Sequence, residues 1–132
     1  MANTFDNKLP RTTTYWKEGE IFFIKHDSFR VSLEEGQAIA ELLRFAMEDR
    51  STKALLINNR QAKGAWSKEI NELWEGGSEN TANLPVKKMA TLTNSVITTM
   101  QINRISKSNG IEKWSKAFNS EFNDEVKAFL LR

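Results

Sequence analysis

The feature that most constrains the fold of this 132-residue chain is a repeated switch between two spacings of apolar residues. Short, nearly continuous apolar runs are typical of strands buried on both faces, and they occur at 21–24 and 53–58, while residues 86–92 are read as another strand. Apolar residues that recur every three or four positions indicate helices, at 32–50, 66–74 and 95–108. This alternation predicts a mostly parallel sheet joined by right-handed helical crossovers.

The two ends of the chain complete the predicted fold. Residues 12–16 favour a strand, and residues 17–20 with Gly19 predict the turn of an antiparallel hairpin. Phe29–Val31 can continue the second strand, 115–118 predicts a last strand, and Asn123 begins a final helix. The predicted fold class is α/β: one domain with a central mixed sheet of about five strands, a leading hairpin and four helices. Residues 1–10 predict a flexible arm, and residues 11–132 the domain.

Local signals support the predicted helix ends. Ser32 with Glu35 three residues later is a capping box, and Gly36 in the first turn lowers helix propensity only slightly. Thr93-Asn94-Ser95 joins a strand to the third helix and lacks the glycines of a phosphate-binding loop. We therefore interpret it as a structural joint in which Asn94 or Ser95 caps the helix.

Composition excludes several classes of function. The chain has 19 basic and 17 acidic residues, interspersed, so a continuous basic stripe for nucleic acid is not expected. It has no cysteine, which excludes disulfides, thiolate metal sites and a cysteine nucleophile. There is no run of 18 apolar residues and no signal-peptide pattern, so we expect a cytoplasmic protein without membrane insertion.

Catalytic motifs are not apparent in the sequence. Neither a glycine-rich phosphate loop nor G-x-S-x-G occurs. His26 is the only histidine, and with Asp27 it could form a base and its orienting carboxylate. Neighbouring strand residues point to opposite faces, however, so we interpret His26 as an ordinary polar residue at a strand end. No enzyme activity, cofactor or metal site is predicted.

Large apolar residues on two helices have alternative interpretations. Trp66 and Trp74 lie on one stripe of the second helix, where they either cover the sheet or form a partner interface, in which tryptophan is enriched. On the third helix, Ile97, Met100 and Arg104 are expected to belong to the core and its rim.

The C-terminal third carries a pattern beyond periodicity. It combines an alanine-containing strand, a polar turn, a helix with an asparagine near its end, a short strand closing on Phe, and an acidic helix start before an aromatic-leucine pair. These features are Met89-Ala90-Thr91-Leu92, Asn94-Ser95-Val96, Asn103, Phe118, and Asp124-Glu125 before Phe129-Leu130. The pattern resembles small bacterial proteins of the STAS-like, SpoIIAA-like class, and the likeness covers about residues 15–131.

The resemblance implies a non-enzymatic regulatory or protein-interaction domain that binds an unidentified protein partner or a second copy of itself. In that class a partner kinase phosphorylates a serine in an Asp-Ser-Ser-Gly turn after a buried strand. This chain has Asn58-Asn59-Arg60-Gln61 there, and Ser67 is the nearest serine, either a phosphorylation site or a helix cap. The partner-face candidates are Asn58, Asn59, Arg60, Trp66, Ser67 and Trp74. An alternative is a carrier of a small lipid or nucleotide.

Overall fold

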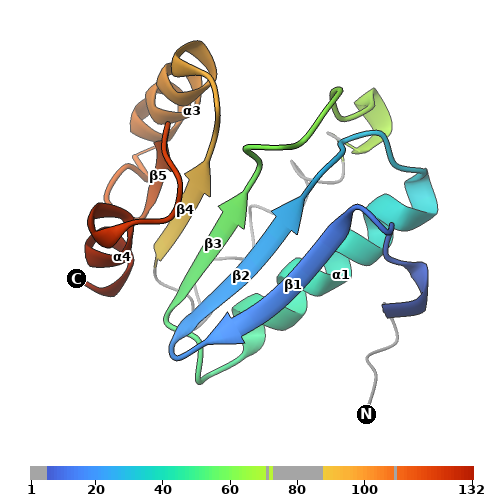
Figure 1. Cartoon of the computed structure of the whole chain (residues 1–132), viewed down its shortest axis with the longest axis horizontal. Helices are drawn as coiled ribbons and strands as arrows, with labels where there is room; N and C mark the ends of the chain where they lie inside the picture. Colours follow the sequence, from blue (N-terminus) through green and yellow to red (C-terminus); the bar gives the residue numbers. More distant parts are fainter. Residues whose placement is uncertain (1–5, 71, 73–87, 109) are drawn as a thin grey trace.

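The computed structural model describes residues 6–70, 72, 88–108 and 110–132 (Figure 1). A short 3₁₀ turn, η1 (Asp6–Lys8), precedes the sheet. The strands are β1 (Thr13–Glu18), β2 (Ile21–His26), β3 (Ala54–Asn58), β4 (Lys88–Leu92) and β5 (Ser115–Phe118). The helices with defined bounds are α1 (Leu33–Glu48), α3 (Val96–Ser108) and α4 (Asp124–Leu131), and residues 68–70 are also helical.

The five strands form one mixed sheet in the order β1-β2-β3-β4-β5. β1 pairs antiparallel with β2, and every later pair is parallel. The predicted α/β fold, with its leading hairpin and four helices, is confirmed. Within the described residues, no helix combines the length and the apolar composition needed to cross a bilayer.

The hairpin is tighter than the sequence predicts. Glu18 pairs with Ile21, so the strand includes Lys17 and Glu18 and the loop is only Gly19-Glu20. Gly19 has φ of 59°, and no described non-glycine residue has a positive φ, which is the pattern of a type II′ turn. This turn matches the twist of the two strands, so pairing continues to the last residue before the loop.

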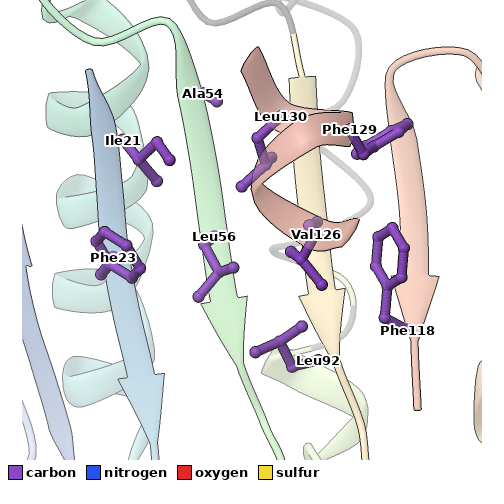
Figure 2. Packing of buried hydrophobic residues seen from close by; sticks show 10 residues of the cluster. Ile21, Phe23, Ala54, Leu56, Leu92, Phe118, Val126, Phe129 and Leu130 are labelled. Atoms are coloured by element: carbon purple, nitrogen blue, oxygen red, sulfur yellow. The ribbon is translucent and has the colours of Figure 1, made fainter. Parts of the chain in front are cut away.

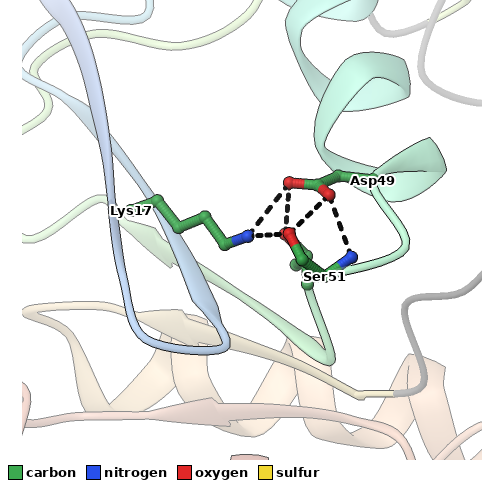
Figure 3. A network of polar contacts seen from close by, with 4 residues as sticks. Lys17, Asp49 and Ser51 are labelled. Atoms are coloured by element: carbon green, nitrogen blue, oxygen red, sulfur yellow. Dashed lines mark hydrogen bonds and ion pairs between the residues drawn. The ribbon is translucent and has the colours of Figure 1, made fainter.

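Polar groups close both ends of α1. The Ser32 hydroxyl accepts from the Glu35 amide at 3.1 Å, and the Glu35 carboxylate accepts from the Ser32 amide at 2.8 Å, which confirms the capping box. At the other end the Asp49 carboxylate accepts from the Ser51 hydroxyl and amide, and Lys17 of β1 donates to both Asp49 and Ser51 (Figure 3). These hydrogen bonds, that of the Ser51 hydroxyl above all, hold the pKa of Asp49 well below its usual range.

Each face of the sheet packs against a different helix. On one face α1 buries Ala38, Leu42 and Ala46 against Phe22, Ile24 and Leu55. On the other, α4 covers β3 and β4 with Val126, Phe129 and Leu130, as Figure 2 shows. β3 therefore directs Ala54 and Leu56 to α4 and Leu55 to α1, and all three are buried. Burial on both faces explains its nearly continuous apolar sequence.

Two N-terminal segments differ from the sequence-based expectation. Within the predicted arm, Pro10 is buried and Leu9 packs against the α1 core, so the packed part of the chain begins before residue 11. Phe29–Val31 does not continue β2. Instead, Ser28 forms an isolated bridge with Lys63, and the Phe29 amide donates to the Lys63 carbonyl at 2.9 Å. The segment after β2 is thereby fastened to the loop after β3.

The third helix has the opposite orientation to the one expected. Ile97 and Met100 are 67% and 66% exposed, so the expectation that they belong to the core is wrong. Ser106 is buried, and Asn103 bonds to the backbone of β5, so a partly polar face packs inward. Apolar spacing predicted the helix correctly, but hydrogen bonds to the sheet edge set its orientation.

Candidate functional site at the carboxyl edge of the sheet

Two strand-to-helix turns meet at the carboxyl edge of the sheet. Residues 59–67 follow β3, and residues 93–95 follow β4. Because β3 and β4 are parallel neighbours, with Asn58 paired to Leu92, both turns leave the sheet at the same edge. Ligand and partner sites of open α/β sheets lie outside this edge.

Three hydrogen bonds tie the two turns together. The Asn59 amide donates to the Leu92 carbonyl at 2.9 Å. Nη1 of Arg60 donates to the Thr93 carbonyl at 2.6 Å, and Nδ2 of Asn94 donates back to the Arg60 carbonyl at 2.7 Å. Each turn thus satisfies backbone groups of the other, so the edge forms one continuous surface rather than two separate loops.

Each turn is also closed internally. The Asn58 side-chain oxygen accepts from the Arg60 amide at 3.1 Å, an Asx turn that ends β3. The Ser95 hydroxyl accepts from the Thr98 amide at 3.2 Å and caps α3. Of the two predicted caps, Ser95 is therefore the cap, whereas Asn94 serves as a tie between the turns.

Asn59 lies at the centre of this edge with an unsatisfied side chain. Its Oδ1 is the one buried side-chain oxygen or nitrogen that finds no partner within the described part of the chain. Leaving a buried acceptor unpaired costs about 1–3 kcal/mol. Sequence reasoning named Asn59 as a candidate but gave no reason to separate it from Asn58, because the orphaned oxygen follows from how the turns pack.

Trp66 anchors the far side of the β3 turn. Its ring lies 4.5 Å from the Phe29 ring centroid and 5.4 Å from that of His26, and the side chain is half-buried. Trp66 precedes the helical residues 68–70, so its predicted place on the helix is wrong. The loop therefore presents an aromatic residue beside the polar ties, held in place by two other rings.

His26, the last residue of β2, packs against the Trp66 ring of this loop. It is buried, and its Nδ1 lies 2.9 Å from the Thr13 hydroxyl. Burial lowers the pKa of His26 to about 4, against the opposing effect of Asp27, so the ring is neutral at pH 7. Thr13 rather than Asp27 holds the ring, as the alternation of strand side chains predicted.

Ser67 caps the helical turn that follows. Its hydroxyl accepts from the Ile70 amide at 3.2 Å, as the cap interpretation predicted, and its side chain is exposed. Ile70 is fully buried beside Gly36 of α1. Trp74, the last partner-face candidate, lies outside the described residues.

The structure thus brings together five of the six candidate residues. Asn58, Asn59, Arg60, Trp66 and Ser67 lie along one loop, and Thr93, Asn94 and Ser95 join them from the next turn. Sequence reasoning treated the two turns as separate. The parallel pairing of β3 and β4 was the signal that could have joined them. Within the described residues, no three His, Asp or Glu side chains gather as metal ligands would.

Comparison of the chain with protein-family models, with curated proteins and with solved structures found no match in any of the three.

Proposed function

We propose that this chain is a non-enzymatic regulatory domain of the STAS-like type that binds a protein partner through the carboxyl edge of its sheet. The observation that carries the proposal is the reciprocal tie between the two turns, in which Arg60 and Asn94 bond to each other's turns. A surface fixed before binding loses little conformational entropy on association, and this favours recognition.

The chemistry of the edge also supports a protein partner. Half-buried Trp66 and the polar Asn58–Arg60 segment combine an aromatic anchor with backbone and amide hydrogen-bonding groups. Tryptophan and arginine are enriched among the residues that dominate binding energy at protein interfaces.

Reversing one charge on this edge tests the proposal. Lys63 is exposed in the same loop as Trp66, three residues before it, and Lys53 is exposed before β3, at the opposite edge of the sheet. Proteins captured by the immobilised full chain are compared for Lys63→Glu and for the matched control Lys53→Glu. A partner of this edge should bind Lys63→Glu roughly tenfold more weakly and the control unchanged. Equal binding to both variants would place the interface elsewhere.

A switch at Ser67 can be separated from its capping role. Asp and Asn both replace Ser well as helix caps, but only Asp adds negative charge. If phosphorylation of Ser67 regulates the partner face, Ser67→Asp should change the affinity of the captured partner by at least roughly fivefold and Ser67→Asn should not. The same change in both variants would assign Ser67 a capping role alone.

A further inference from the structure

A hollow of about 410 Å³ lies along the edge strand β5, on the side of the sheet where α4 packs. Its walls are the start of β4 at Lys88, the segment that leads into β5, and one face of α4. Glu125 and Phe129 contribute from α4, where a spacing of four residues places them on one face, and Arg132 contributes from the C-cap position just after the helix. Its volume falls in the range of small-molecule pockets, about 300–1,000 Å³.

The hollow has an excess of positive charge. Four cationic side chains line it, those of Lys88, Lys113, Lys116 and Arg132. Within the described residues none of the four has an ion pair, whereas Lys17, Lys25, Arg44 and Lys53 each have one. The acidic side chains among the described lining residues are Glu112 and Glu125, so the side chains of these residues carry a net charge of two positive units.

Two aromatic rings hold the lysines in place. The Lys88 ammonium lies 4.8 Å from the Phe129 ring centroid, and the Lys116 ammonium lies 5.0 Å from that of Phe118. Figure 2 shows Phe129 of α4 beside Phe118 of β5. The two rings meet edge to face, with centroids 5.7 Å apart. A cation–π contact orients an ammonium group without a hydrogen-bond acceptor, so its N–H donors stay available.

We propose that this hollow binds the phosphate group of a small phosphate monoester. Such a group carries about −1.5 to −2 charge at neutral pH, which matches the net charge of the lining. Lysine binds phosphate as a point charge, and Lys88 and Lys116 extend from the same face of neighbouring strands. Phe118 and Phe129 are themselves buried, so their rings position the two ammonium groups and leave recognition of the phosphate to the lysines. The hollow shares no lining residue with the partner-face candidates, although the carbonyl of its Phe118 accepts from the Thr93 amide at 2.9 Å.

The test is a titration of the full chain with phenyl phosphate, followed by backbone amide NMR and by calorimetry. Binding should saturate, with the largest shifts in residues 112–118 and at Lys88. The double variant Lys88→Gln, Lys116→Gln keeps the length of both side chains and should weaken binding roughly tenfold or more. The matched control, Lys53→Gln with Lys127→Gln, removes the same charge from exposed positions outside the hollow and should leave affinity unchanged.

Lys113→Gln provides a second variant that disturbs neither cation–π contact. Its side chain is exposed, so it should fold as the parent does and still lose several-fold in affinity. Succinate is the dicarboxylate comparison and should bind more weakly than phenyl phosphate. Absence of saturable binding, equal loss in the control variant, or succinate binding as tight as that of phenyl phosphate would overturn the proposal.

Discussion

Gly36 shows how a single residue fixes the junction between two helices. It lies in the first turn of α1, where a Cβ would overlap the end of the fully buried Ile70 side chain. The sequence indicates only that glycine is tolerated there, since helix propensity depends on local structure. The reason for glycine is a contact with a residue 34 positions later in the chain, which no local pattern reveals.

Gly36→Ala should therefore destabilise the protein, despite the better helix propensity of alanine. We expect a loss of about 1–3 kcal/mol in the free energy of unfolding, because the added methyl group overpacks the junction. Chemical denaturation measures this loss.

Ile70→Val is the partner change, because valine lacks the terminal carbon that the new methyl group would meet. Combined with Gly36→Ala, it should recover part of the loss, which gives a favourable coupling energy in a double-mutant cycle. Greater stability of Gly36→Ala alone would show that Ile70 moves aside freely.

At the scale of elements, the side chain of Asn103 links helix α3 to strand β5. Nδ2 of Asn103 donates to the Ala117 carbonyl at 3.1 Å, and its Oδ1 accepts from the Ala117 amide at 2.8 Å. The side-chain amide of Asn103 thus makes the two hydrogen bonds to Ala117 that a further strand would make at the unpaired edge of β5. Edge strands with unpaired backbone groups are prone to pair with other chains, and this contact blocks such pairing at Ala117.

Asn103→Ala should release this contact. The loss of two hydrogen bonds predicts a decrease of about 2 kcal/mol in the free energy of unfolding. Hydrogen exchange at the Ala117 amide should also become faster, whereas a purely global effect would accelerate all slowly exchanging amides alike.

Gln101→Ala on the exposed side of the same helix is the control, and it should change neither quantity. If Asn103→Ala behaved like this control, the contact with β5 would contribute nothing to stability.

The sequence predicted where helices and strands begin and end better than it predicted which face of a helix is buried. The cap at Ser32 and the strand Ser115–Phe118 were correctly predicted, and the cap of α3 was narrowed to Asn94 or Ser95, because each depends on neighbours within a few positions. The face of α3 that packs inward was predicted wrongly. Ile97 and Met100 are apolar, as buried residues usually are, but both are exposed. Tertiary hydrogen bonds of Asn103 decided the orientation instead.

For the whole molecule, the mixed sheet with its leading antiparallel hairpin was predicted from the sequence, whereas the candidate site was predicted only in part. Strand–helix alternation and the right-handed crossover rule leave few topologies, and the observed sheet is one of them. The loop after β3 was named from its position. The orphaned oxygen of Asn59 and the ties to Asn94 were not foreseen, because they depend on side-chain packing between segments about 34 positions apart.

Global stability should depend on pH through His26. Its pKa is about 4 in the folded protein and about 6.5 when unfolded, so between these values only the unfolded chain binds the proton. Stability from this group is complete above pH 6.5 and is lost progressively as pH falls to about 4. The shift corresponds to about 3 kcal/mol at most, since one pKa unit is about 1.4 kcal/mol. Denaturation curves across this pH range measure the effect.

His26→Gln isolates that contribution from those of the carboxylates. The variant should be less stable at pH 7 but should show a shallower decline below pH 6.5 than the parent. Parallel declines in the two proteins would show that His26 does not keep its neutral form in the folded state.

The order of the strands in the sheet affects how the chain can fold during its synthesis. Every strand pairs with the one synthesised immediately before it, so no strand has to wait for a segment made much later. During translation the sheet can extend one strand at a time, and the core beneath α4 is completed last. Ribosome-bound chains of increasing length should therefore gain protease resistance in steps, beginning with the unit that ends at β3.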